Sequence, residues 1–477
     1  MPLPFYLSCL AILVVCWYAW EHRQESWGLP ACMVLGTVSV WYIGDVFYND
    51  YASYGVTIGK GSLVSAWWQV LLFVIAFGVM VIPVHRLVNS KLLKRSSSVV
   101  AYLETNRLRR RGVQRKIDLI AGGLLIGWLI LMVIALVQVK GNAIGLFAPY
   151  LGQKVNPWAR GQIGGGFSAL ISFAEYLQVF FTASFGVLAA VAMNRRTRAI
   201  AIAICFFALP FYLFDRTRNT ILVTMLPGIL AFVFLRLRSS LPVKLLLLGC
   251  MFMFTNLWFS LILANRSGMS LDIGSVISGE GLEEDAHHAG LNMFEELAWI
   301  NHLTSSGRYI PNFGSNYLAV LANPIPRGLW KNKPTMGLDY ALARGQVEVG
   351  SKGQMSATIS MGLIGQGVAN FGGVIGPPAA ALLVSLWVAF LARQDLKGAD
   401  PGRMIIYGGG MIGTFNLGRD FTLIALYPFL LGWAFLFMRN HYRRKSDPIN
   451  ERTRSHRRGK RRRRTRNEPR ESITHGQ

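Results

Sequence analysis

The sequence has little charge, and above all little acidic charge. Only 15% of its 477 residues are charged, and 24 of them are Asp or Glu. A soluble chain normally carries about a quarter charged residues. This shortage excludes an ordinary soluble enzyme, and the 52% hydrophobic content excludes a disordered or collagen-like chain.

The sequence also lacks a cysteine framework. Its five cysteines show neither metal-ligand spacing nor the pattern of a disulfide scaffold, and all of them lie inside apolar runs: Cys9, Cys16, Cys32, Cys205 and Cys250. We interpret them as helix-packing residues, and we expect no metal and no other cofactor. The first apolar run has no preceding Lys or Arg and no cleavage site, which predicts a retained helix.

Long apolar runs are what the sequence does contain. A run of about 17–25 apolar residues can cross a bilayer as a helix. Eleven segments have this character: 3–20, 28–48, 62–85, 117–139, 167–193, 199–214, 219–235, 245–264, 373–392, 404–417 and 421–438. The sequence therefore predicts an all-α polytopic membrane domain of about eleven transmembrane helices over residues 1–438.

Basic residues are concentrated in alternate connections, and this predicts an orientation. Segment 86–116 holds ten Lys and Arg residues, so it is expected on the cytoplasmic side. Alternation from there places the N-terminus on the outer side and 439–477 on the inner side. In this arrangement 35 of the 49 Lys and Arg residues face the cytoplasm, and none lies within a span.

The C-terminal segment 439–477 carries fifteen Lys and Arg residues, five of them in the run 460–464. Near an anionic membrane each basic residue contributes roughly 1 kcal/mol of attraction. We interpret this segment as a disordered cytoplasmic tail that binds anionic lipids. No folded module or stacking aromatics accompany the run, so no nucleic-acid partner is expected.

One large hydrophilic stretch, 265–356, is predicted on the outer side. After it, 357–371 is uncharged and rich in Gly and small residues, and Pro377-Pro378 follow. We interpret 357–371 as a re-entrant or interfacial helix that leads into the next span. Irregular backbone at membrane depth is tolerated only against protein or a wet cavity. The sequence therefore indicates an outward-facing, partly buried cavity.

Two short outer turns carry arginine, against the bias of positive charge toward the inner side. Arg216 and Arg218 lie in the turn 215–218, and Arg419 lies beside Asp420 in the turn 418–420. Such arginines either extend to lipid headgroups or bind a diphosphate or carboxylate through the guanidinium fork. The sequence leaves both interpretations open.

Few acidic residues fall within the predicted spans. Asp45 and Asp118 are near span ends and are expected to reach the membrane interface. Glu175 lies about two turns inside its helix. A carboxylate at that depth is costly, so it is either a functional group or paired with an arginine in the bundle. In the outer stretch, His287 is a candidate base or hydrogen-bond donor.

Residues 323–334 read NPIPRGLWKNKP. They resemble the NPIPR-x-x-W-x-x-KP stretch of bacterial O-antigen and exopolysaccharide polymerases of the Wzy type. The small polar segment 357–360, followed by Asn370-Phe371-Gly372, resembles that family's run before a late helix. Arg216-Thr217 resembles the Arg-Thr pair that enters a middle helix.

This resemblance implies a membrane-embedded, GT-C-like glycosyltransferase in a bacterial inner membrane, with a periplasmic N-terminus and late loop. It would polymerise oligosaccharide repeat units carried on undecaprenyl (polyprenyl) diphosphate, which serves as both donor and acceptor. A flippase and a chain-length regulator are the protein partners it implies. The related O-antigen ligases share this layout. A polysaccharide or lipid transporter is a further alternative, although no internal repeat supports it.

The resemblance also implies roles for individual residues. Arg216 and Arg218 suit metal-independent stabilisation of the diphosphate leaving group, but a guanidinium cannot act as the base. The candidate bases are Glu175, His287, Glu295 and Glu296. Further substrate contacts are expected from Arg266, Arg327, Lys333, Arg419 and Trp330. The outer aromatics either stack on sugar rings or anchor the membrane interface: Trp299, Tyr309, Trp330 and Tyr340.

Overall fold

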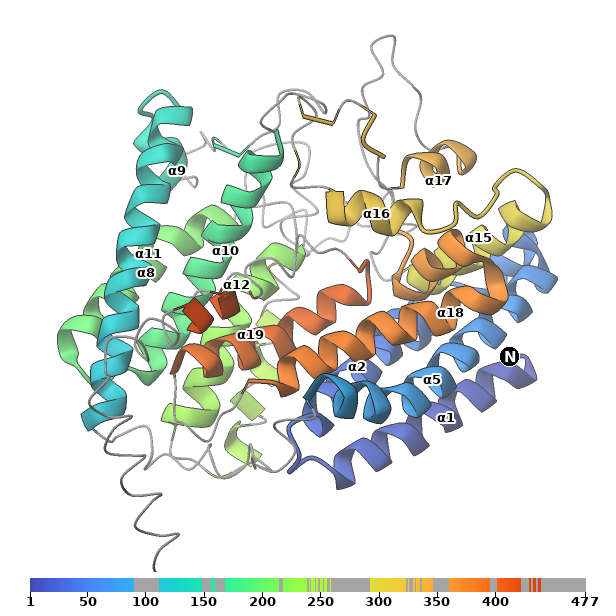
Figure 1. The fold of residues 1–477 in the computed structure, drawn as a ribbon, viewed down its shortest axis with the longest axis horizontal. Coiled ribbons are helices and arrows are strands. Elements are labelled where there is room, and N and C mark those ends of the chain that lie inside the picture. Colours follow the sequence, from blue (N-terminus) through green and yellow to red (C-terminus); the bar gives the residue numbers. More distant parts are fainter. Residues whose placement is uncertain are drawn as a thin grey trace, which may run out of the picture. The chain divides into compact units, whose positions relative to one another are not determined.

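The structure is a computed structural model of the chain. It describes residues 1–89, 111–147, 168–213, 218–237, 292–322, 337–345, 360–394 and 401–421, with single residues or short pieces within 155–158, 240–258, 325–334 and 429–438. All regular elements in these ranges are helical (Figure 1). The chain divides into two compact units, Met1–Phe429 and Leu430–Gln477. The predicted tail 439–477 lies outside the described residues.

Within the described ranges, six helices are long and apolar enough to cross a membrane, which indicates a membrane protein. They are Leu3–Glu21, Gly28–Phe47, Tyr51–Asn89, Gln114–Gln138, Arg195–Leu213 and Leu363–Ala392. All six coincide with predicted spans. The predicted spans 245–264 and 421–438 lie largely outside the described residues. The count of eleven, the orientation and the GT-C-like class stay predictions.

The N-terminal part is built from α1 and two interrupted helices. The first of these joins α2 to a π-helical turn and to α3, and the second joins α4 to another π-helical turn and to α5. Their bounds are α1 Leu3–Glu21, α2 Gly28–Val38, η1 Ser39–Ile43, α3 Gly44–Tyr48, α4 Tyr51–Tyr54, η2 Gly55–Gly59 and α5 Lys60–Asn89. On α1, large apolar side chains such as Leu13 and Trp17 are exposed, as expected for a helix surface that faces lipid.

The middle of the chain forms a second group of helices. Their bounds are α8 Arg111–Gln138, α9 Ala143–Phe147, α10 Ser168–Val191, α11 Arg195–Leu213, α12 Arg218–Ala231 and η4 Phe232–Arg236. Helices α10 and α12 cross where Gly186 meets Gly228. A Cβ atom on Gly228 would lie 2.9 Å from the Gly186 backbone. Two glycines are therefore needed for this close approach, as is common between membrane helices.

The late hydrophilic stretch contains more structure than its composition predicts. It folds into α15 (Met293–Ser305), α16 (Ser315–Ala322) and α17 (Leu338–Ala343). One face of α15 is fully buried through Phe294, Leu297 and Ile300. The Phe294 ring stacks on Trp67 of α5, with ring centroids 4.2 Å apart. This stretch therefore shares a core with a predicted membrane helix.

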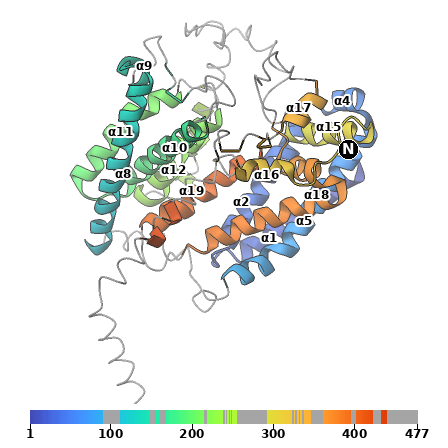
Figure 2. The same ribbon diagram turned by 45° about the horizontal axis from the view of Figure 1, so that its top comes forward.

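Two helices follow, α18 (Leu363–Ala392) and α19 (Pro401–Leu417). In Figures 1 and 2, α18 lies alongside α5. A break divides α18 at Gly372, whose φ of 79° is left-handed. The short helix before the break folds back onto the part of α18 after it. The two parts are so close that a Cβ atom on Gly367 would lie 2.3 Å from the Gly376 carbonyl oxygen. A helix is thus present within the predicted segment 357–371. Its re-entry into the membrane stays a prediction.

Candidate functional site

The predicted site residues fall into two groups. Four lie outside the described residues: Arg216, His287, Arg266 and Arg327. Arg218 is the first residue of α12, but its side chain also lies outside the described part. The other four are described, and they come from three different parts of the chain: Glu175, Lys333, Arg419 and Trp330.

Three of these residues belong to neither of the polar clusters described below. Glu175 is half-buried on α10, one turn before Gln178, whose side chain accepts a hydrogen bond from the Trp158 indole. Lys333 donates from Nζ to the carbonyl oxygen of Ile325 at 3.0 Å. Trp330 is partly exposed. That the predicted site residues form one site stays a prediction.

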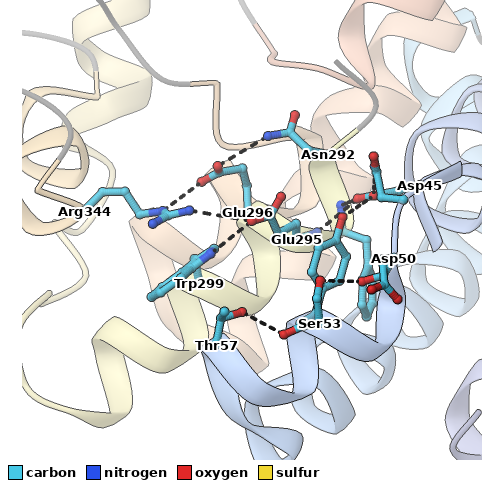
Figure 3. Close-up of polar contacts among 12 residues, drawn as sticks. Asp45, Asp50, Ser53, Thr57, Asn292, Glu295, Glu296, Trp299 and Arg344 are labelled. Atoms are coloured by element: carbon cyan, nitrogen blue, oxygen red, sulfur yellow. Dashed lines mark hydrogen bonds and ion pairs between the residues drawn. The ribbon is translucent and has the colours of Figure 1, made fainter. Parts of the chain in front are cut away.

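The first polar cluster, called the Arg344 cluster, comprises Asp45, Glu295, Glu296, Arg344 and Tyr340. The first four are labelled in Figure 3. Asp45 is completely buried. Its Oδ2 accepts from the backbone N–H groups of Phe294 at 2.8 Å and Glu295 at 3.0 Å. These N–H groups have no partner within α15. A carboxylate of one predicted span thus caps a helix of the hydrophilic stretch, and the helix dipole favours its charge.

The other oxygen of Asp45 is also occupied. Oδ1 accepts from Asn49 Nδ2 at 2.7 Å and from the Tyr54 hydroxyl at 3.1 Å. Four donors therefore satisfy this carboxylate. Asp45 was expected at the membrane interface from its position near a span end. In the structure it is a buried cap, which suits a structural role.

Glu296 is enclosed by the same network. It is 2% exposed, it accepts from the Tyr340 hydroxyl, and its Oε2 lies 3.7 Å from Arg344 Nε. Burial raises the pKa of Glu296 to about 7, although Tyr340 and Arg344 favour the charged form. Burial and the neighbouring Glu296 raise the pKa of Tyr340 well above its usual value.

Arg344 closes the cluster at its edge. Its guanidinium carbon lies 3.8 Å from the centroid of the Trp299 ring, and Nη2 is 3.8 Å from Glu295 Oε1. The Trp299 indole donates to the same Glu295 oxygen at 3.3 Å. Arg344 thus pairs with both glutamates of this cluster, while neutral donors surround Asp45. The cluster therefore attaches α15 to α17 and to α3, the helix that contains Asp45.

The second polar cluster, called the Arg419 cluster, comprises Tyr317, Ser360, Gln366, Asn416, Arg419 and Asp420. Arg419 is exposed and donates from Nε to Ser360 Oγ at 2.7 Å. Asp420 Oδ1 accepts from the backbone N–H of Met361 at 3.1 Å. Burial raises the pKa of Asp420 to about 6, while Ser360 and Arg419 act in the opposite direction. The turn after α19 thus meets the start of α18.

The Arg419 cluster contains several buried polar atoms without a hydrogen-bond partner. Gln366 is completely buried; its Oε1 accepts from the backbone N–H of Phe421 at 2.9 Å, but its Nε2 has no hydrogen bond. The Tyr317 hydroxyl and Asn416 Oδ1 are likewise buried and unpartnered. Nearly all buried polar groups in native proteins are satisfied, so such atoms require an explanation.

A polar ligand would explain them. The cluster offers donors on Arg419, Gln366 and Tyr317 and acceptors on Asp420 and Asn416. Burial and the nearby Asp420 carboxylate raise the pKa of Tyr317, so its hydroxyl keeps its proton as a donor. Its ring stacks on Phe371. Donors and acceptors beside an aromatic ring are suited to hydroxyl groups and phosphate oxygens.

The described residues contain no group of three or more His, Cys, Asp or Glu residues that is placed to hold a metal ion. Three of the aromatic side chains in the predicted outer stretch are covered by protein. Tyr309 and Tyr340 are buried and contact each other edge to face, so neither ring is open to a sugar. Trp299 is covered by Arg344.

The sequence singled out only part of the Arg419 cluster. Arg419 and Asp420 stand out as charges in a short outer turn, and Ser360 belongs to a segment that carries the family resemblance. Gln366 and Tyr317 were missed. The available signal for Gln366 was a single amide within the otherwise apolar and Gly-rich run 361–369. Comparisons with known proteins give no match: no family model, no curated protein and no solved structure aligns with the chain.

Proposed function

We propose that this protein is a membrane-embedded glycosyltransferase that polymerises oligosaccharide repeat units carried on a polyprenyl diphosphate. The supporting structural observation is the Arg419 cluster, in which an exposed arginine accompanies buried donors without partners. The supporting sequence observations are the resemblance of 323–334 to Wzy-type polymerases and the arginines in two predicted outer turns.

The chemistry follows from the leaving group. Nucleotide sugars are absent outside the cytoplasm, so the donor there is a lipid-linked sugar. The acceptor hydroxyl attacks the anomeric carbon, the bond from that carbon to the phosphate oxygen breaks, and the lipid diphosphate leaves with the electron pair. Arginines stabilise the charge that develops on it. Arg216 and Arg218 are assigned this role, and Arg419 is assigned to substrate binding.

The acceptor hydroxyl must also lose a proton to a base within reach. Glu296 is a weak candidate, because Tyr340 and Arg344 enclose it. Asp420 joins Glu175, Glu295 and His287 as a candidate. Its pKa of about 6 leaves it ionised at neutral pH, while its basicity exceeds that of an ordinary aspartate.

The test is a glycan analysis of cells that carry Arg216→Ala, Arg218→Ala or Arg419→Ala. The expected result is loss of long surface glycan chains with retention of products that contain a single repeat unit. Arg196→Ala, an exposed arginine on the predicted inner side, is the matched control and should leave chain length unchanged. Each variant is compared at equal membrane expression.

The product pattern separates polymerase from its alternatives. Loss of the single-repeat product together with the long chains would favour a ligase or a transporter. Normal chain length in Arg216→Ala and Arg218→Ala at normal expression would refute the leaving-group assignment.

A further inference from the structure

Large apolar side chains are exposed beside the break in α18. Phe313 is 86% and Ile310 is 75% exposed. Four more residues of this kind are on α16 and on the first turn of α18 after the break: Leu318, Leu321, Val374 and Ile375. We call these six residues the apolar rim. Exposed apolar clusters on a protein surface mark contacts with a partner or a membrane.

Backbone contacts hold the rim at the break. The N–H of Asn312 donates to the carbonyl oxygen of Ala369 at 3.2 Å. A Cβ atom on Gly314 would lie 3.3 Å from the Phe371 ring. In Figures 1 and 2, α16 lies beside the first part of α18. The connection between α15 and α16 therefore lies beside Gly372, at the same height along the axis of α18.

The position of Gly372 relative to the lipid bilayer follows from the length of the helix after it. The part of α18 after the break, 373–392, has twenty residues, and at 1.5 Å per residue it is about 30 Å long, which matches the hydrocarbon core of a bilayer. Arg393 follows directly at its other end. Gly372 therefore marks one boundary of the hydrocarbon core.

The rim continues the lipid-facing side of this helix. Ile375, Leu382 and Leu386 are all exposed, and their spacing of seven and four residues places them on one face. Val374 and Ile375 end this face at the boundary. The adjoining Ile310 and Phe313 extend it sideways onto the α15–α16 connection.

The local backbone fits a surface that contacts lipid. Phe313 has φ of 49°, a left-handed conformation that is unusual for a bulky residue, and its ring is exposed rather than packed. Arg308, two residues before Ile310, is exposed as well. An arginine next to apolar side chains is suited to bind lipid phosphate while its neighbours enter the acyl region.

We propose that the apolar rim inserts into the outer boundary of the lipid bilayer, so that part of the hydrophilic stretch 265–356 is a monotopic membrane contact. The partner is the bilayer itself. The segment from Ile310 to Leu321 then holds α15, α16 and the Arg419 cluster at a fixed height above the lipid. This inference does not depend on the proposed enzymatic activity.

The test uses spin labels on the full chain in liposomes of phosphatidylethanolamine and phosphatidylglycerol. The five cysteines are replaced by alanine, and single cysteines are introduced as Phe313→Cys, Ile310→Cys and Ser306→Cys. Ser306 is exposed and polar and precedes the rim by four residues, so it is the matched control. Leu386→Cys serves as the reference within the span. Gel filtration confirms that each labelled chain is folded.

Power saturation compares the accessibility of each label to oxygen, which partitions into lipid, and to a water-soluble nickel chelate. At 313 and 310 the ratio of oxygen to nickel accessibility is expected to be several-fold higher than at 306 and to approach that at 386. Equal ratios at 313 and 306 would overturn the proposal. Protection of 313 from both reagents would overturn it too, because a protein would then cover the rim.

Discussion

Asp45 shows how one buried carboxylate connects segments that are far apart in the sequence. It accepts from Phe294 and Glu295, about 250 residues away. The sequence placed Asp45 near a span end, but it could not identify these partners, because a capping interaction between distant segments leaves no periodic signal. Arg419 and Asp420 could be identified from the sequence, because two charged residues in a short predicted outer turn stand out without knowledge of their partners.

Asp45→Ala should destabilise the docking of α15. It leaves two buried N–H groups, the Asn49 amide and the Tyr54 hydroxyl without their acceptor, and the expected cost is about 2–5 kcal/mol. Hydrogen exchange of the peptide 292–305 in detergent should accelerate strongly. Asp50→Ala is the control, because Asp50 caps the exposed helix α4 through Ala52 alone. Similar exchange of 292–305 in both variants would contradict the assignment.

Glu296 should make stability depend on pH. Its pKa rises from 4.5 to about 7 in the folded protein, so the folded state binds the extra proton. The free energy of unfolding is therefore largest below pH 4.5 and decreases as pH rises through 7. Glu296→Gln mimics the protonated form and should remove this decrease, which stabilises the protein at pH 8 by on the order of 1–3 kcal/mol.

Thermal unfolding in detergent between pH 5 and pH 8 measures this effect. Glu21→Gln, at the exposed end of α1, controls for the loss of one negative charge. If the melting temperature of Glu296→Gln falls with pH as steeply as that of the unmodified chain, Glu296 is not the group responsible.

Among the helices, the described spans follow the hydropathy of the sequence, because each must supply about twenty apolar residues to cross a bilayer. The glycines of 357–371 and the prolines that follow also predicted a separate short helix before 373–392. The helices α15 to α17 were not predicted. Their apolar residues are interspersed with polar ones, and a stretch with sixteen charged residues suggests a solvated loop until its buried face is known.

The fold-back in α18 depends on glycine at the contact. Gly367→Ala places a Cβ atom 2.3 Å from the carbonyl oxygen of Gly376, in the part of α18 after the break. This clash cannot be relieved by a change of rotamer, because the contacted atom belongs to the backbone. We expect a loss of about 1–3 kcal/mol or more and a lower folded yield by gel filtration of a fluorescent fusion.

Gly36→Ala in α2 is the matched control, because no atom lies within 4 Å of its added Cβ. It should be neutral or stabilise the helix by up to about 1 kcal/mol. Equal yields for the two variants would show that the helices before and after Gly372 are not in close contact.

For the whole molecule, the bias of basic residues predicts one orientation. A fluorescent protein fused after residue 477 should be fluorescent, as it is only in the cytoplasm, and alkaline phosphatase inserted at residue 285 should be active, as it is only outside. A chain truncated after residue 440, with the fluorescent protein fused at the new end, should give both results. Segment 86–116 retains its ten basic residues, and these are expected to determine the topology. An inactive phosphatase at 285 would refute the predicted arrangement.

The pairing of α5 with α18 has a consequence for biosynthesis. About 270 residues separate Asn89 from Leu363, which takes roughly 15–55 s to translate at typical rates. For most of that interval Gln69 on α5 lacks Asn301, its partner for two hydrogen bonds. The first three apolar helices are therefore without part of their packing and hydrogen bonding until α15 and α18 are made. Until α18 is made, the face of α5 that it covers in the folded protein is open to insertion factors and membrane proteases.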